Sequence, residues 1–243
     1  MNAWWAQTRA EVRMTIRRGE TLLLTLGIPV ALLVFFSTTK VVSVPTGSRI
    51  DFMAPGILAL CVLSTSLVAL SISTGFERSY GVLRRLHVTP LGQRRLIGAK
   101  IAGVAVTQVI QVVVLAVVAL ALGWHPHASA LGDLEVAAVL ALGSAGCAGI
   151  GLLLAGRLRA EVNLAASNGL YLMLLMLSGI VVPLSSLPSG VARAVQWLPS
   201  GAMAAAVHNV LSFATSPTLS QWCTLGLWAL LAPLLAARTF RFD

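Results

Sequence analysis

The residues that most often carry out chemistry in proteins are few in this 243-residue chain. The eight acidic residues all lie at the ends of long apolar runs or outside them. A carrier driven by protons or sodium needs a carboxylate within the membrane, and a voltage sensor needs stacked arginines. An ATP-independent channel or secondary carrier is therefore only an alternative function for this chain.

Metal and nucleotide sites are not indicated either. The three cysteines lie in apolar runs without a CxxC pair, and the sequence contains no HExxH motif. It also lacks the GxxxxGK[ST] loop that binds phosphates, and no stretch is long enough for a soluble nucleotide-binding domain. We therefore predict no catalytic residue, no metal ligand and no cofactor bound by this chain. A membrane-embedded enzyme is a remote third possibility.

The longest polar interruption of the apolar sequence is the stretch 76–100, which contains a single acid, Glu77. Its basic residues are Arg78, Arg84, Arg85, Arg94, Arg95 and Lys100. Basic residues beside apolar spans favour the cytoplasmic side of a membrane. We therefore interpret the stretch as a cytoplasmic loop with a short helix, in which 94–100 anchors the span that follows.

The composition predicts an all-α integral membrane protein. Hydrophobic residues make up 57% of the chain and charged residues only 10%, whereas about 25% of a typical soluble domain is charged. Because about 20 helical residues cross the hydrocarbon core, we place six spans at 21–39, 52–74, 96–122, 134–155, 163–182 and 219–237. The net charge of +9 then reflects basic loops rather than binding of nucleic acid.

The distribution of basic residues predicts that both termini lie in the cytoplasm. With the N-terminus inside, all of the 17 basic residues fall in cytoplasmic segments except Lys40, Arg49 and Arg193. Residues 1–20 have the pattern of an amphipathic helix in the membrane interface, with Trp4 and Trp5 facing lipid. The chain is thus predicted to be a multi-pass protein of the cytoplasmic membrane.

The segment 183–217 does not fit a simple span. It is half apolar, but Pro183, Pro188 and Pro199 interrupt it. We predict short re-entrant helices in the outer leaflet, which are tolerated where protein or a water-filled cavity covers the irregular backbone. A seventh span over 201–213 is the alternative.

Two segments resemble those of ABC-2 type permeases, the membrane subunits of ATP-binding-cassette exporters. ERSYGVLRRL at 77–86, followed by VTPL at 88–91, resembles the segment after the second span of that family, with Val82 where threonine is common. The stretch 177–208 resembles the segment after the fifth span, and the matching positions are Pro183, Leu187, Pro188, Trp197 and Pro199. The chain resembles the short antibiotic- and lipid-type exporter permeases of this family, such as the daunorubicin-resistance and nodulation types.

The resemblance implies that the first segment is a coupling helix, which rests on a separate ATPase subunit. The implied coupling residues are Glu77, Arg78, Tyr80, Gly81, Leu83, Arg84, Arg85, Leu86, Thr89 and Pro90. Glu77 is expected near the helix start, where it complements the dipole, and Thr89-Pro90 at its end. Tyr80, Leu83 and Leu86 are expected to form the apolar contact face, and Arg84 and Arg85 to pair with acids of the partner.

Polar residues in or near the apolar runs leave two interpretations open. Gln108 and Gln111 either line a substrate path or, as we favour, bond a neighbouring helix. His208 and Asn209 either contact substrate or are ordinary loop residues, and Asn163 and Asn168 are equally ambiguous. The small residues of GSAGCAGIG, at 143–151, favour close packing of helices.

The resulting expectation is a single transmembrane domain that exports an amphiphilic drug, antibiotic or lipid. Its parts are the interfacial helix, spans 1–2, the coupling loop, spans 3–5, the outer re-entrant segment and span 6 with its tail, at 1–20, 21–75, 76–95, 96–182, 183–217 and 218–243. The resemblance implies two ATPase subunits, which bind ATP and Mg²⁺, and a second permease chain in a homodimer or heterodimer. The remaining partners are membrane lipids.

Overall fold

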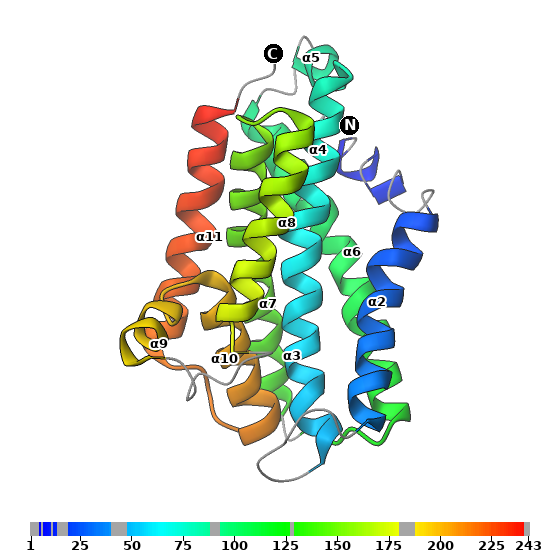
Figure 1. Cartoon of the computed structure of the whole chain (residues 1–243), viewed down its shortest axis with the longest axis vertical. Coiled ribbons are helices and arrows are strands. Elements are labelled where there is room, and N and C mark those ends of the chain that lie inside the picture. Colours follow the sequence, from blue (N-terminus) through cyan, green and yellow to red (C-terminus); the bar gives the residue numbers. More distant parts are fainter. Residues whose placement is uncertain are drawn as a thin grey trace.

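The computed structural model describes residues 5, 7–10, 12–13, 19–39, 48–87, 93–126, 129–179 and 188–240, and the side chains of all of these except 19–24, 84, 86–87 and 93–94. All regular structure in these residues is helical, which confirms the all-α prediction (Figure 1). The elements are α2 (Gly19–Thr38), α3 (Arg49–Leu63), η1 (Ser64–Ala69, a π-helix), α4 (Leu70–Ser79), α5 (Val82–His87), α6 (Gln93–Ala121), α7 (Ala130–Ala155), α8 (Ala160–Leu177), α9 (Ser189–Val195), α10 (Pro199–Phe213) and α11 (Leu219–Thr239).

Within the described residues, five helices are long and apolar enough to cross a membrane, and α2 contains a shorter apolar helix, Thr25–Thr38. The first of the five helices runs through α3, η1 and α4 without a break. The five helices are Arg49–Ser79, Arg95–Ala121, Ala130–Ala155, Ala160–Leu177 and Leu219–Thr239. Each overlaps one of the predicted spans, and Thr25–Thr38 lies within the first predicted span.

The long helices form a bundle in which helices consecutive in sequence run in opposite directions along the length of the molecule (Figure 1). One end of the bundle carries α5, and we call it the α5 end. The opposite end carries α9 and α10, and we call it the α10 end. The described N-terminal residues and the end of α11 both lie at the α5 end (Figure 1).

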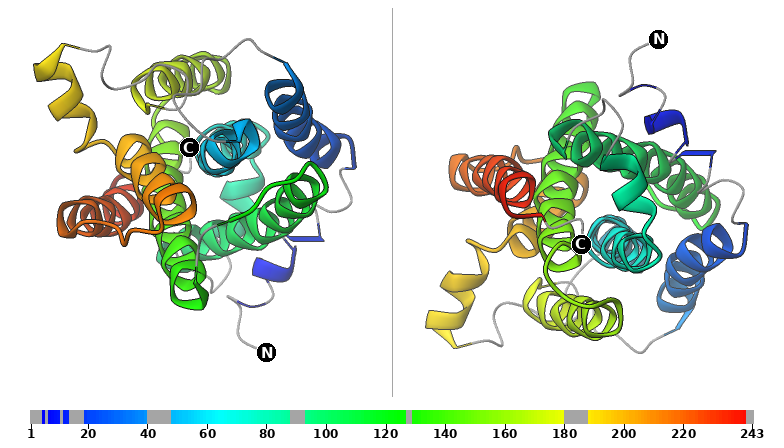
Figure 2. Two further views of the ribbon diagram at one scale, coloured as in Figure 1. Left: turned by 90° about the horizontal axis from the view of Figure 1, so that it is seen from below. Right: turned by 90° about the horizontal axis from the view of Figure 1, so that it is seen from above.

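The helix Arg49–Ser79 lies in the middle of the bundle, with α2, α6, α7 and α8 around it, and α11 packs on the far side of α7 (Figure 2). It is 72% buried over its most apolar stretch and α7 is 61% buried, whereas the other three candidate spans are 22–33% buried. These two helices are therefore the core against which the others pack.

The small residues of α7 allow other helices to approach its backbone. A side chain at Gly149 would meet the backbone of Pro233 in α11, and one at Gly143 would meet Met203 in α10. A side chain at Gly151 would lie 2.7 Å from the carbonyl oxygen of Leu67 in η1. The run GSAGCAGIG therefore has the packing role that the sequence predicted.

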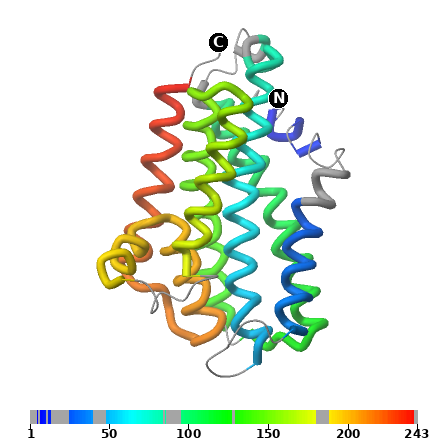
Figure 3. The backbone as a smooth tube through the Cα atoms, in the orientation of Figure 1, coloured from blue at the N-terminus to red at the C-terminus, as the bar shows by residue number. Residues whose placement is uncertain are grey.

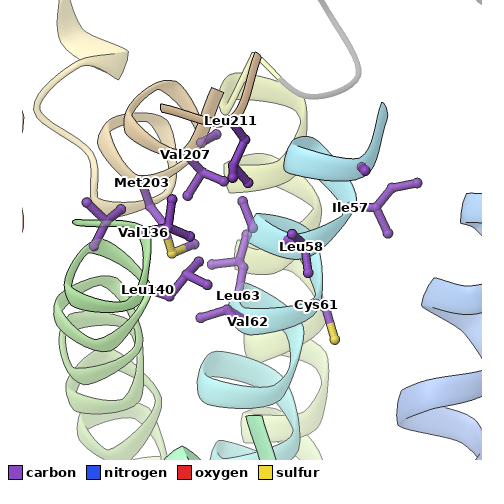
Figure 4. Close-up of a cluster of buried hydrophobic side chains, with 14 of the residues drawn as sticks. Ile57, Leu58, Cys61, Val62, Leu63, Val136, Leu140, Met203, Val207 and Leu211 are labelled. Atoms are coloured by element: carbon purple, nitrogen blue, oxygen red, sulfur yellow. The ribbon is translucent and has the colours of Figure 1, made fainter. Parts of the chain in front are cut away.

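Two apolar clusters lie along the bundle. The larger joins α3, α7 and α10 and is shown in Figure 4, where Leu58, Leu63, Leu140, Met203 and Val207 point toward one another. The smaller lies toward the α5 end and joins α4, α5, α6, α7 and α11. Its buried members are Leu70, Leu83, Leu96, Ile97, Val104, Ala148, Leu152, Ala236 and Phe240.

Short helices are found in the described part of the segment 183–217, as predicted (Figure 3). The helix α10 has 15 residues, which at 1.5 Å per residue is about 22 Å and falls short of a hydrocarbon core of about 30 Å. It does not run the length of the bundle (Figure 1). The helix α10 is thus not among the described helices long and apolar enough to cross a membrane, and the structure gives no support to a seventh span over 201–213.

Candidate functional site

The α4–α5 corner at the α5 end contains the residues expected to couple transport to an ATPase. The helix α4 ends at Ser79, and Gly81 has a φ of 72°, a left-handed conformation that glycine adopts without strain. The backbone N–H of Gly81 donates to the carbonyl oxygen of Arg78 at 3.0 Å, and α5 begins at Val82. The turn at Gly81 thus ends the long helix Arg49–Ser79 and separates it from the short helix α5.

Glu77 lies within the last turn of α4, so the expectation that it begins a helix is wrong. Its carboxylate would gain nothing from the negative end of the α4 dipole. It is instead held by Lys100 of α6, whose Nζ donates to Oε2 at 2.6 Å. The Lys100 side chain is only 2% exposed and that of Glu77 17%. Lys100 is therefore a buried partner of Glu77.

Leu83 is the residue that fixes α5 to the bundle. Its side chain is fully buried, among Leu70 of α4, Leu96 and Ile97 of α6, and Leu152 of α7. The expectation that Leu83 faces a partner subunit is therefore wrong, because the bundle itself occupies that face of α5. The buried Leu83 side chain thus packs α5 against α4, α6 and α7.

The corner also presents an exposed surface. Tyr80 is 74% exposed, Val82 is 41% exposed, and Arg85 is exposed. The ring of Tyr80 stacks on Phe76, with 6.1 Å between centroids. Four further predicted coupling residues are not placed: Thr89 and Pro90 lie outside the described residues, and the side chains of Arg84 and Leu86 are not described.

Arg78 connects the corner to a distant part of the chain. Its Nη2 donates to the carbonyl oxygen of Leu158, in the turn between α7 and α8, at 2.8 Å. The guanidinium is therefore used within the chain, and the α4–α5 corner has direct contacts to α6, to the end of α7 and to the start of α8.

Gln108 and Gln111 bond neighbouring helices, which is the interpretation that we favoured from the sequence. Gln108 is 6% exposed and donates to the carbonyl oxygen of Val62 at 3.1 Å, beside the π-helix η1. Gln111 is fully buried; it accepts from Thr65 at 3.0 Å and donates to the carbonyl oxygen of Thr25 in α2 at 3.3 Å. The two amides therefore join α6 to α3, η1 and α2 in the middle of the bundle.

A second buried polar cluster joins α4 to α8. The amide of Asn163 accepts from the hydroxyl of Ser71 at 2.9 Å and donates to the carbonyl oxygen of Ser71 at 2.9 Å. The hydroxyl of Ser167 donates to that of Ser71 at 2.8 Å. A side chain at Gly75 would lie 2.6 Å from Asn163. Asn163 is thus a helix-joining residue, whereas Asn168 is exposed and bonds only the carbonyl oxygen of Leu164 in its own helix.

The predicted residues at the α10 end have mainly structural contacts. The ring of His208 lies edge-on to Phe52, with 4.7 Å between centroids, and the amide of Asn209 is 3.4 Å from the side-chain oxygen of Gln221. Pro188 and Pro199 stand at the starts of α9 and α10, and the carbonyl oxygen of Trp197 accepts from Trp228 at 2.9 Å. Pro183 and Leu187 lie outside the described residues.

Sequence reasoning missed the Glu77–Lys100 pair and the Ser71–Asn163 cluster. One signal was available for the first, since Lys100 stands inside the apolar run of the third span, where a cation needs a partner. For the second, serine and asparagine at helical spacing do not specify which helix they face.

Comparison with known proteins agrees with this architecture. The family model for the ABC-2 type transporter matches residues 2–206. The chain is also 26% identical over 206 residues to the Bacillus subtilis (strain 168) protein named "Putative transport permease YvfS", and the match covers 82% of each chain.

The chain is thus a multi-pass transport permease, the membrane subunit of an ABC transporter. It belongs to the ABC-2 type transporter family, as the resemblance of its two segments implied. Membrane subunits of this family are typically not catalytic themselves, and they generally work with ATPase partners.

Proposed function

We propose that this permease exports an amphiphilic drug, antibiotic or lipid across the cytoplasmic membrane, powered by two separate ATPase subunits. The α5 end faces the cytoplasm, in agreement with the arginines that gather there. Two permease chains form the transport path between them, as a homodimer or a heterodimer. ATP and Mg²⁺ bind to the ATPase subunits.

The observation that carries the proposal is the construction of the α4–α5 corner. One face of the corner is fixed in the bundle by Leu83 and by the Glu77–Lys100 pair. The opposite face exposes Tyr80, Val82 and Arg85. A partner that binds the exposed face can therefore move α4 and α6 together.

A displacement of the α4–α5 corner would then pass to the other helices through the contacts of Lys100 and Arg78. Lys100 carries a displacement of α4 to α6, and Arg78 carries it to the α7–α8 turn through its hydrogen bond to Leu158. The central helix Arg49–Ser79 continues from the corner to the α10 end without a break. Closure of the ATPases would thus change the position of the helix on which the rest of the bundle packs.

The proposal is tested by co-expression with candidate ATPase subunits and reconstitution in lipid vesicles. The variants Tyr80→Ala and Arg85→Ala should leave the thermal stability of the permease unchanged, because both side chains are exposed. They should weaken co-purification of the ATPase by about tenfold, the cost of removing a well-packed aromatic or arginine contact.

Trp197→Ala is the matched control, since Trp197 is 62% exposed at the α10 end. It should leave ATPase binding intact. Transport that proceeds without any ATPase, driven by a proton gradient, would contradict the proposal and favour a secondary carrier.

A further inference from the structure

A cavity of about 590 Å³ opens at the α5 end, between the ends of α7 and α11. Its described lining residues are Arg157, Arg238, Thr239 and Phe240. The two arginines are 81 positions apart in sequence (238 minus 157), and the fold brings both to one opening. The volume is in the range of pockets that hold small ligands.

The charge of this cavity favours an anion. Both guanidiniums are exposed, and within the described part of the chain neither makes an ion pair. The C-terminal ends of α7 and α11 contribute about half a negative charge each, so two arginines leave a net charge of about +1 at the opening. No acidic side chain is among the described lining residues.

The apolar surroundings show what kind of anion fits. An exposed leucine face runs along α11, made of Leu227, Leu230, Leu231, Leu234 and Leu235. Arg238 follows Leu234 and Leu235 by four and three residues, so it stands at the end of the same face. The opposite side of α11 is buried against α7 through Ala232 and Ala236.

Phe240 forms the inner wall of the cavity. Its ring is 8% exposed and packs over Gly156, where a side chain would lie 2.7 Å from the ring. A ligand in the cavity would contact the two guanidiniums and the ring of Phe240. The exposed leucine face of α11 would contact its apolar part.

We propose that this cavity binds the phosphate of an anionic phospholipid, with the acyl chains lying along the leucine face of α11. Basic pockets between membrane helices on the cytoplasmic side bind anionic headgroups in this manner. The orientation of the site rests on the proposed function, which places the α5 end in the cytoplasm. The binding itself requires neither ATP nor the ATPase.

The test measures binding of dioleoylphosphatidylglycerol to the purified full chain in nonionic detergent by native mass spectrometry, with dioleoylphosphatidylcholine, a zwitterion without net charge, as the comparison. Each of Arg157→Gln and Arg238→Gln should weaken phosphatidylglycerol binding by about fivefold, and the double variant by about twenty- to thirtyfold, because one basic residue near the surface contributes about 1 kcal/mol. Binding of phosphatidylcholine should change by less, because its choline cation offsets the charge of its phosphate.

Arg95→Gln is the matched control, since Arg95 is an exposed arginine of α6 that does not line the cavity. It should change phosphatidylglycerol binding by less than about twofold. Arg238→Lys keeps the charge and should retain most of the binding, which separates loss of charge from misfolding. Thermal stability without added lipid should be equal for all these variants.

Three outcomes would overturn the proposal. Equal phosphatidylglycerol affinity of the wild type and the double variant would show that the arginines do not bind the headgroup. Full competition by millimolar inorganic phosphate would assign the site to a free anion rather than a lipid. Loss of ATPase co-purification in the double variant, with lipid binding unchanged, would assign the arginines to a protein contact. Failure of the proposed export function would leave the lipid measurement unaffected.

Discussion

Apolar packing is found at both ends of the bundle, but the ion pair of the described residues lies at the α5 end. At the α5 end, the Glu77–Lys100 pair and the hydrogen bond from Arg78 to Leu158 join segments far apart in sequence. At the α10 end, Met203 and Val207 fill a space between α3 and α7 (Figure 4). A charged hydrogen bond requires a particular distance and direction, whereas apolar packing mainly requires a matching volume. On the proposed function, these directional contacts would pass a displacement from one helix to a particular neighbour.

The largest expected effect comes from breaking the ion pair of the α5 end. Glu77→Gln removes the carboxylate from Lys100, whose charge stays in a side chain that is 2% exposed. Removing one partner of a buried pair costs about 3 kcal/mol or more. We expect a lower midpoint of thermal unfolding in detergent than for the wild type.

The control for this variant is Glu161→Gln, which neutralises an exposed acid at the start of α8. It should lower the unfolding midpoint much less, because an acid in the first turn of a helix contributes only about 0.3–1 kcal/mol. The double variant Glu77→Gln, Lys100→Met should recover part of the lost stability, since no charge then remains buried. If Glu77→Gln unfolds at the same temperature as the wild type, the ion pair does not hold the α5 end together.

The second prediction compares one buried residue from each end. Leu83 is 0% exposed at the α5 end and Met203 is 1% exposed at the α10 end. Replacement of either by alanine should cost about 3 kcal/mol, because a buried cavity is created in both cases. Only Leu83→Ala should also reduce the transport rate per folded complex, since it loosens α5 from the bundle.

The measurement for this pair is ATP hydrolysis and substrate transport in vesicles, each normalised to the folded permease. We expect Met203→Ala to keep the wild-type ratio of transport to hydrolysis, and Leu83→Ala to lower it. The same ratio in both variants would remove the functional difference between the two ends.

The sequence predicted the spans well because each depends on a local property. Twenty apolar residues are enough to predict a membrane helix, and the five candidate spans overlap the predicted ranges. The glycines of α7 were also informative, since small residues favour close helix packing in any orientation.

The details of the α4–α5 corner were less predictable because they depend on three-dimensional contacts. The motif located the corner, but the pattern of Tyr80, Leu83 and Leu86 did not specify which residue faces the bundle. Leu83 is buried and Tyr80 is exposed, although both were expected on one contact face. Glu77 was misplaced because its partner, Lys100, is 23 residues away (100 minus 77) and on another helix.

The smallest expected effect concerns the middle of the bundle, between the two ends. Gln111→Leu removes the acceptor of Thr65 and the donor to the carbonyl oxygen of Thr25. Hydrogen bonds between membrane helices contribute about 0.6 kcal/mol on average and about 1.7 at most. We therefore expect a loss of about 1 kcal/mol in the free energy of unfolding. Asn168→Leu is the control, since that amide bonds only its own helix, and it should have no measurable effect.

A double-mutant cycle with Thr65→Val separates the contribution of the Thr65–Gln111 hydrogen bond from the other effects of Gln111→Leu. The effects of Gln111→Leu and Thr65→Val should not add, because both remove the same 3.0 Å hydrogen bond. A loss larger than that of Glu77→Gln would identify the anchoring of η1 as the main joint of the bundle. A loss of the expected size leaves the ion pair of the α5 end as the stronger constraint on the central helix Arg49–Ser79.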